Sequence, residues 1–83
     1  MRYELRYWMV CTVDGDVDQK ESYTEVIQAD NDKEAIMVAV GFLETQRSGL
    51  VIPYGPSLHE GTRLIAWSNP AHPPTAHTLA YIG

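Results

Sequence analysis

Carboxylates recur in the first third of the chain at a spacing that a calcium loop could use. Asp14, Asp16 and Asp18 occupy the first, third and fifth positions of an EF-hand-like loop, and Glu25 falls at the twelfth, where calcium takes a bidentate carboxylate. The sixth position is Gln19 instead of the glycine that the loop requires, and the flanking residues alternate as strands do. The pattern therefore favours an acidic hairpin turn over a calcium site.

Three histidines form the second group of side chains that could do chemistry. His59, His72 and His77 could meet at one end of a sheet, and Glu60 could then complete a zinc site. The prolines at 73 and 74 prevent His72 and His77 from sharing a helix face, so their spacing matches no helix-borne metal motif. The stretch is more typical of a stiff surface loop. A small metal-binding enzyme or sensor that uses the three histidines stays as an alternative hypothesis.

Length and composition indicate one ordinary globular domain. The chain has 83 residues, of which 45% are hydrophobic and 20% charged, so we expect a single domain over 1–83 with a thin core. The longest apolar run, Ala35 to Leu43, is far shorter than the roughly 20 residues that cross a bilayer. The single cysteine, Cys11, excludes an internal disulfide and is expected to pack within a strand. We therefore expect a soluble, cytoplasmic protein with no catalytic residue, no cofactor and no metal.

The charge distribution divides the chain into an acidic part and a nearly neutral remainder. The net charge is −5, yet residues 14–34 carry eight acids against two lysines. Six basic residues in the whole chain and the lack of a glycine-rich phosphate loop argue against direct nucleic-acid binding. Arg2 and Arg6 beside Trp8 would form at most a weak stacking patch. The acidic segment is either a solvated surface or a contact surface for a basic protein partner.

The first part of the chain is predicted to form a hairpin. Apolar or aromatic residues occupy the odd positions from Tyr3 to Val13 with polar residues between several of them, which is the period of a half-buried strand. Residues 14–20 contain Asp-Gly-Asp turn chemistry and would reverse the chain into a second strand over 21–29. On that strand Glu25 would share a face with Tyr23.

A capped helix is predicted over residues 32–47. Asn31 precedes it as the N-cap, and Glu34 at the third helical position completes a capping box. A stripe of apolar residues at helical spacing would face the sheet. Three further apolar residues widen the apolar surface beyond that stripe: Met37, Val38 and Phe42. Either the sheet curls around the helix, or a partner covers these residues, and that partner could be a second copy of the chain in a homodimer.

The second half of the chain is predicted to complete the sheet. We expect a short strand over 50–52, turns over 53–56 and 59–61, and strands over 63–68 and 75–82 that the proline-rich loop connects. The predicted fold class is α+β. It is a small two-layer domain in which an antiparallel sheet of four or five strands, in the order β-β-α-(β)-β-β, packs on one α-helix.

The run YTEVIQADNDKEAIMVAV, residues 23–40, resembles the small acidic anti-CRISPR inhibitors of phages, in which a strand leads through a capped turn into a helix. The resemblance implies a non-enzymatic inhibitor in the host cytoplasm. Such a protein binds a crRNA-guided surveillance complex or its nuclease and keeps DNA out of a basic channel. No functional residue is carried over from the resemblance, because such inhibitors share no motif.

The leading hypothesis is therefore a protein-binding module whose acidic face covers a basic surface of a nucleic-acid-handling complex. It has no direct contact with nucleic acid or membrane. The residues predicted for this face are the acids of the hairpin and of the turn before the helix: Asp14, Asp16, Asp18, Glu21, Glu25 and Asp30.

Overall fold

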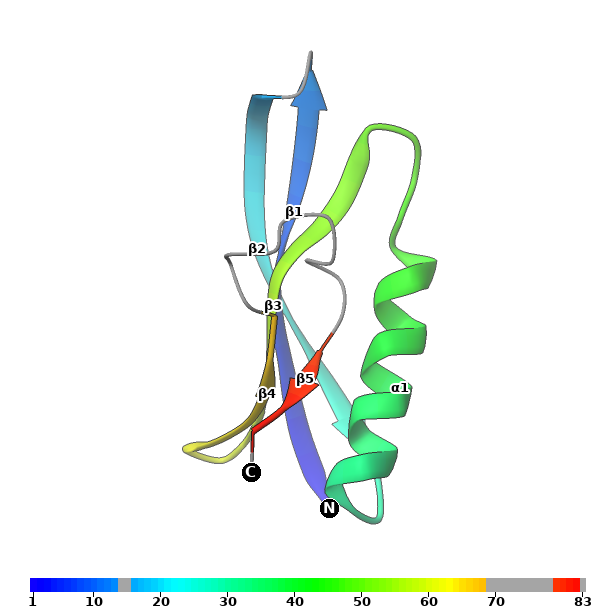
Figure 1. The fold of residues 1–83 in the computed structure, drawn as a ribbon, viewed down its shortest axis with the longest axis vertical. Helices are drawn as coiled ribbons and strands as arrows, with labels where there is room; N and C mark the ends of the chain where they lie inside the picture. The colour runs from blue at the N-terminus through cyan, green and yellow to red at the C-terminus, as the bar shows by residue number, and fades with distance from the viewer. Residues whose placement is uncertain (14–15, 69–78, 83) are drawn as a thin grey trace.

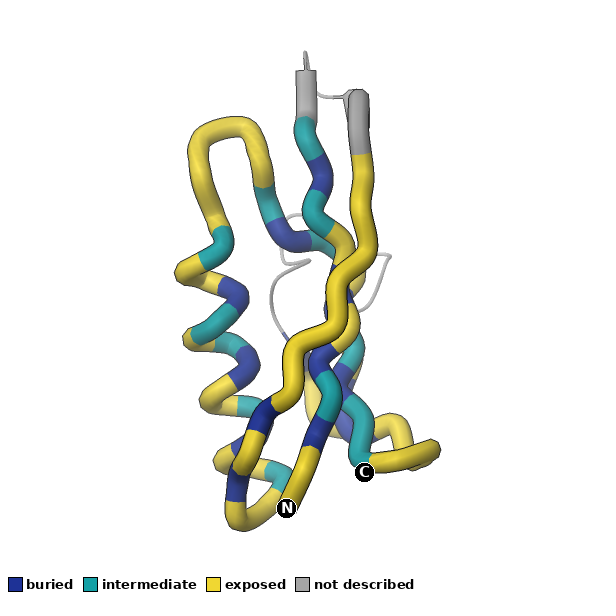
Figure 2. The backbone as a smooth tube through the Cα atoms, turned by 180° about the vertical axis from the view of Figure 1, so that it is seen from behind, coloured by how far each residue is buried: buried dark blue, intermediate teal, exposed yellow. Residues whose placement is uncertain are grey.

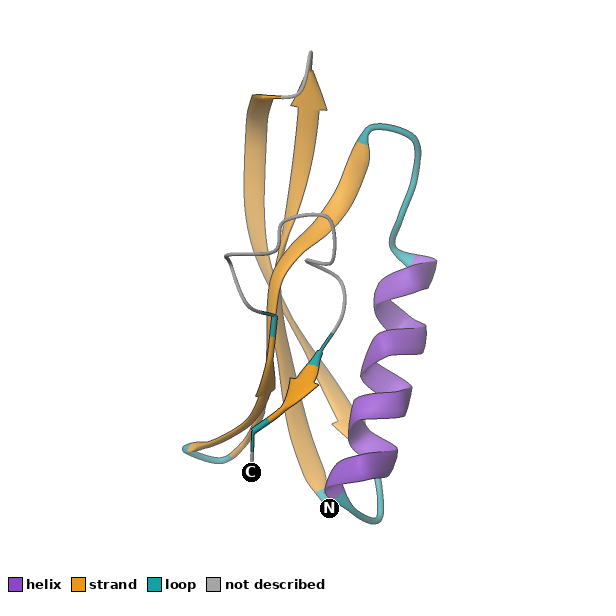
Figure 3. Cartoon of the chain, viewed as in Figure 1, coloured by secondary structure: helices purple, strands orange, loops and turns teal. Residues whose placement is uncertain are grey.

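Five antiparallel strands and one helix form the computed structural model, which describes residues 1–13, 16–68 and 79–82. In chain order they are β1 (Arg2–Val13), β2 (Asp16–Gln28), α1 (Asp32–Thr45), β3 (Val51–Glu60), β4 (Arg63–Trp67) and β5 (Ala80–Tyr81). The order across the sheet is β2-β1-β3-β4-β5, and α1 lies along one side of it (Figure 1, Figure 3). The predicted α+β class is confirmed. The strand order in the sheet differs from the order along the chain, because the helical connection carries the chain from β2 across to the other side of β1.

The β1–β2 hairpin is longer than predicted and extends beyond the C-terminal end of α1 (Figure 1). β2 begins at Asp16, so the expected turn over 14–20 is wrong: most of that segment continues the strand. The register pairs Leu5 with Glu25 and Tyr7 with Tyr23. Directly paired side chains lie on the same face of a sheet, so Glu25 and Tyr23 share a face as predicted.

The core lies between α1 and one face of the sheet, which we call the inner face and define by the odd-numbered residues of β1 from Tyr3 to Cys11. Buried residues of this face pack against the helix in one cluster that includes Tyr3, Leu5 and Leu58 of the sheet and Ala35, Ala39 and Leu43 of the helix. The outer face is the opposite side, defined by the even-numbered residues of β1 from Arg2 to Val10 and their paired neighbours. The alternation of the strand thus separates the two faces as the sequence predicts.

The start of α1 follows the predicted capping box. The Asn31 side chain accepts a hydrogen bond from the Glu34 backbone N–H at 2.9 Å, and the Glu34 carboxylate accepts one from the Asp30 backbone N–H at 2.9 Å. The first bond uses a donor that the first helical turn leaves unpaired, and the second pairs the N–H of the residue before the N-cap. The helix ends at Thr45, two residues before the predicted end, and the chain then turns through Gly49 at a φ of 57°.

β3 is the element in which the structure differs most from the sequence-based prediction. The predicted turn over 53–56 lies inside one ten-residue strand, Val51–Glu60, and of the turn predicted over 59–61 only Gly61 belongs to the observed turn that follows this strand. Gly55 adopts a φ of 59°, and the register with β1 shifts beside it, so the proline-glycine signal marks an irregularity inside a strand. Pro53 is tolerated because this half of β3 pairs with β1 but not with β4, whose partners begin at Ser57.

The last predicted strand can be compared with the structure only in part. Ala80 and Tyr81 form β5 and pair with Trp67 and Ala66 of β4. Positions 75–78 of the predicted strand and the whole proline-rich loop before it lie outside the described residues. The end of the sheet is therefore β5, where the sequence placed its last strand.

Candidate functional site

β2 is the edge strand that carries the predicted acidic face. β1 is its one neighbour in the described sheet, and every side chain from Lys20 to Val26 is exposed (Figure 2). One row of backbone N–H and C=O groups on an edge strand has no partner within the sheet, which makes such a strand a template for another chain. The site therefore offers both side-chain charge and backbone hydrogen-bonding groups.

Glu21 and Glu25 lie on the inner side of β2, and both are exposed. The Tyr23 hydroxyl between them donates a hydrogen bond to Glu21 at 2.6 Å, and this bond raises the pKa of Tyr23. The Tyr23 ring stacks on Tyr7 with centroids 5.8 Å apart, and Tyr7 contacts Phe42 edge to face at 5.9 Å. The aromatic contacts and this hydrogen bond together connect Glu21 to the core.

The six predicted acids do not all occupy one surface of the described structure. Asp30 is exposed in the turn between β2 and α1, at the opposite end of β2 from the hairpin tip. Asp14 lies outside the described residues, as do the side chains of Asp16 and Asp18. The acidic edge whose geometry is known therefore consists of Glu21 and Glu25 on β2, and we keep this name for it.

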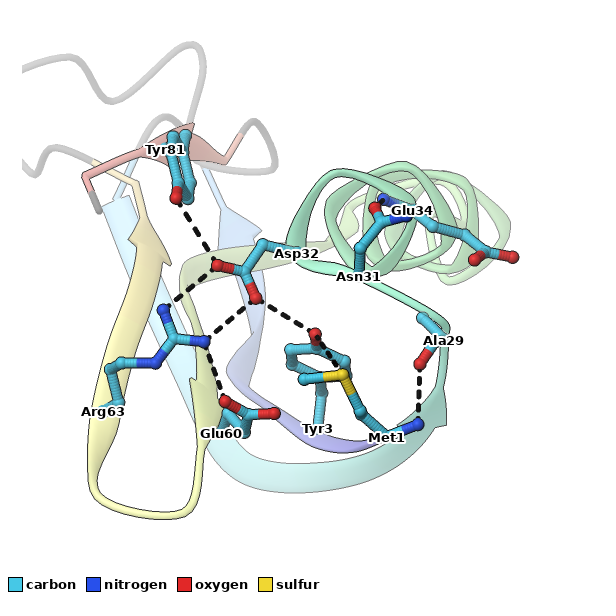
Figure 4. A network of polar contacts seen from close by, with 9 residues as sticks. All are labelled: Met1, Tyr3, Ala29, Asn31, Asp32, Glu34, Glu60, Arg63 and Tyr81. Carbon is cyan, nitrogen blue, oxygen red and sulfur yellow. Dashed lines mark hydrogen bonds and ion pairs between the residues drawn. The ribbon is translucent and has the colours of Figure 1, made fainter.

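A second polar cluster surrounds Asp32 where α1 begins (Figure 4). Its carboxylate accepts a hydrogen bond from the Tyr3 hydroxyl at 3.0 Å, two from Arg63 at 3.0 Å each, and one from Tyr81 at 3.4 Å. Arg63 also donates to Glu60 at 2.7 Å. Since the cluster joins α1 to four strands and each Asp32 oxygen accepts two hydrogen bonds, we call it the Asp32 clasp and assign it a structural role.

The ionisation of the Asp32 clasp agrees with that role. The bidentate bond from Arg63 is the main cause that lowers the pKa of Asp32, so the carboxylate stays charged. Burial and the adjacent carboxylate raise the pKa of Tyr3 to about 12, so its hydroxyl stays protonated and donates. Neither shift brings a group toward neutral pH, where a general acid or base works best.

A groove of about 670 Å³ lies beside the Asp32 clasp. Its lining is largely apolar through Met1, Ile36, Met37 and Tyr81, and it also includes three charged residues, Asp30, Asp32 and Lys33. It brings together Asp30 and Met37, which the sequence analysis assigned to different surfaces. Val38 is also exposed on α1, whereas Phe42 is half-buried and packs against the core.

The comparisons with known proteins add no relative to this picture. No family model, curated protein sequence or solved structure matches the chain. No helix among the described residues is long and apolar enough to cross a membrane. We therefore infer function from the side chains of the chain itself.

The histidine hypothesis can be followed at one residue. His59 lies on β3, half-buried on the outer face, and a ring nitrogen is 2.8 Å from the Ser57 hydroxyl. Burial and the nearby Arg6 lower its pKa, so the imidazole is neutral at pH 7. His72 and His77 lie outside the described residues. The described residues contain no group of three metal-ligating side chains, and the metal hypothesis stays a prediction.

The Asp32 clasp was not predicted from the sequence, although two of its residues are close in sequence. Glu60 and Arg63 flank the turn at Gly61 and form an ion pair at 2.7 Å, a spacing that a hairpin prediction could have used. The sequence predicted Asp32 only as the first residue of the helix. Its contacts with β1 and β4 span 29 and 31 residues of sequence, and no local pattern indicates them.

Proposed function

We propose that the chain is a non-enzymatic protein-binding module that docks through the edge strand β2. The observation that carries the proposal is the run of exposed residues from Lys20 to Val26 on a strand with one neighbour in the described sheet. Extended segments of other proteins add to such edges as a further strand, with affinity from main-chain hydrogen bonds and specificity from side chains. The structure offers this geometry without rearrangement.

Charge defines the kind of partner that suits this edge. Glu21 and Glu25 are exposed, and both stand on the same side of β2. Carboxylates in this position favour a basic segment and raise its rate of association. A basic surface of a nucleic-acid-handling complex has this character, and the resemblance to anti-CRISPR inhibitors suggests a crRNA-guided complex. In this proposal the bound chain covers a surface that DNA would otherwise occupy.

The same charges have a simpler role that an experiment must separate from docking. Charged side chains on an edge strand hinder pairing between identical edges and so prevent aggregation. If Glu25 serves only that purpose, reversing its charge alters solubility and leaves partner binding unchanged. If it contacts a basic partner, the reversal weakens binding while the monomer stays folded.

The test compares Glu25→Lys with Glu44→Lys, an equal change of charge on an exposed residue of α1. Purified crRNA-guided surveillance complex is mixed with each protein, and DNA binding is followed by gel shift. We expect the unaltered chain and Glu44→Lys to inhibit alike, and Glu25→Lys to inhibit about tenfold less well, as for loss of a charged contact. Equal inhibition by the two variants would remove the acidic edge from the proposal, and no inhibition by the unaltered chain would remove this class of partner.

Hydrogen exchange tests the docking geometry independently of charge. When the complex forms, amides of residues 20–26 that face away from β1 should gain protection, because a partner strand would accept their hydrogen bonds. Amides at the exposed positions of α1 serve as the internal reference. Protection confined to α1 would instead assign the interface to Met37 and Val38, the apolar residues that the helix exposes.

A further inference from the structure

The described residues of the outer face carry a net positive charge, opposite in sign to that of the chain as a whole. Arg2 and Arg6 of β1 and Lys20 of β2 are exposed on it, and Glu4 is the one acid among the described residues of this face. Among the side chains that the structure describes, three of the six basic residues of the chain thus share a surface with a single acid. Because Glu4 is 3.1 Å from Arg6 and 3.9 Å from Arg2, two positive charges remain in excess.

Aromatic side chains lie among these cations. Trp8 and Trp67 are 41% and 40% exposed on the outer face, and Tyr54, which pairs with Trp8, is half-buried. Trp67 is two strands away from β1 and level with Arg6, through its pairing with Ser57. Strand spacing and residue rise place the backbones of the two tryptophans about 12 Å apart. Two indoles at that separation can hold bases of one extended strand rather than adjacent stacked bases.

A shallow hollow of about 290 Å³ lies between Trp8 and Arg6. Five hydroxyl-bearing residues contribute to its lining: Tyr7, Ser22, Tyr23, Thr24 and Ser57. The Lys20 amine lies 5.3 Å from the centroid of the Trp8 ring. An indole for stacking, cations for phosphate and hydroxyls for phosphate or sugar oxygens are therefore within reach of one nucleotide.

From this arrangement we propose that the outer face binds single-stranded nucleic acid. One base stacks on Trp8, its phosphate contacts Arg6 and the adjacent hydroxyls, and the strand continues toward Trp67. A sheet face with separate aromatic platforms suits unpaired bases, which expose their ring faces, whereas a duplex conceals them. The surface is distinct from the acidic edge, because Glu21 and Glu25 stand on the inner side of β2.

Fluorescence anisotropy with a labelled twelve-nucleotide oligo-uridine, and a duplex of equal length as reference, tests the proposal on the full chain. We expect a dissociation constant between about 1 and 100 µM, the range of weak electrostatic binding, and weaker binding of the duplex. Three phosphate contacts, one for each exposed cation of the outer face, predict that the logarithm of the association constant falls with the logarithm of the salt concentration at a slope of about −2. Lack of binding at about 100 µM protein, or equal binding of the duplex, would overturn the proposal.

Two pairs of variants separate stacking and local charge from general attraction. Trp8→Ala should weaken binding about tenfold, whereas Trp8→Phe keeps a stacking ring and should lose much less. Arg6→Glu should weaken binding more than Arg47→Glu, an equal change at an exposed residue after α1. Circular dichroism checks that each variant is folded, and Trp8→Phe keeps the test valid if Trp8→Ala is not. Equal losses for Arg6→Glu and Arg47→Glu would refute the phosphate contact assigned to Arg6. Full binding by both Trp8→Phe and Trp8→Ala would refute the stacking assigned to Trp8.

Discussion

Leu43→Ala should be among the most destabilising single truncations on α1. The fully buried residues of the helix are Ala35, Ala39 and Leu43, so the leucine contributes the largest fully buried side chain with which α1 contacts the sheet. Truncation removes that burial and leaves a cavity, which costs about 2–5 kcal/mol for a leucine in a core. An 83-residue domain has a total stability of roughly 4–12 kcal/mol. The variant should therefore lose a large part of its free energy of unfolding.

Urea denaturation followed by circular dichroism measures this loss, with Met37→Ala on the same helix as the matched control. Met37 is 66% exposed, so its truncation should change the free energy of unfolding by less than about 0.5 kcal/mol. A loss below about 1 kcal/mol for Leu43→Ala would show that α1 is not anchored as the structure indicates. A larger loss for Met37→Ala that grows with protein concentration would instead reveal a homodimer that covers Met37 and Val38.

Two further predictions concern the Asp32 clasp and β3. Arg63 lowers the pKa of Asp32 in the folded chain, so the carboxylate stabilises the fold above its ordinary pKa, and this contribution is lost as the pH falls through the lowered value. Thermal melting between about pH 2 and 6 should show a smaller acid-induced fall for Asp32→Asn than for the unaltered chain; parallel curves would contradict the ion pair. Gly55→Ala places a side chain at a φ of 59° and should cost about 1–2 kcal/mol in urea denaturation, and an unchanged midpoint would argue against the irregularity in β3.

The elements that the sequence predicted well are those that local chemistry determines. Asn31 and Glu34 are three residues apart, and their capping bonds need no other part of the chain. The alternation in β1 likewise shows which residues enter the core, and Tyr3 and Leu5 are fully buried. Short-range patterns suffice where the interaction itself is short in sequence.

β3 shows where local signals mislead. Pro53 and Pro56 with Gly55 between them are typical of a turn, and proline is rare in central strands. β3 is central only where it pairs with both β1 and β4, from Ser57 onward. Before that point β1 is its one partner among the described strands, so a missing N–H and a glycine of positive φ are tolerated. The distinction depends on the length of β4, which the sequence of β3 does not contain.

The candidate sites depend on register to different degrees. The acidic edge was predicted because its two described acids belong to one strand. The outer face was not, although Arg2, Arg6 and Trp8 were recognised as neighbours. Lys20 and Trp67 reach that face only through pairing of β1 with β2 and of β3 with β4. The small number of basic residues argued against nucleic-acid binding, but a count over the whole sequence cannot show which charges share a surface.

The two proposed surfaces lie on opposite sides of the same sheet, so a change of charge on one surface should alter binding at the other. Alternation along β2 turns Lys20 to the outer face and Glu25 to the inner side. Groups on opposite sides of a sheet are separated by about 10 Å, close to the Debye length at 0.1 M salt. The acids should therefore oppose nucleic-acid binding at low salt and matter less at higher salt. Glu25→Lys should strengthen oligo-uridine binding below about 50 mM salt while it weakens binding to a basic protein, because the same charge repels one ligand and attracts the other. Loss of both activities in a folded variant would mean that the two surfaces are not independent.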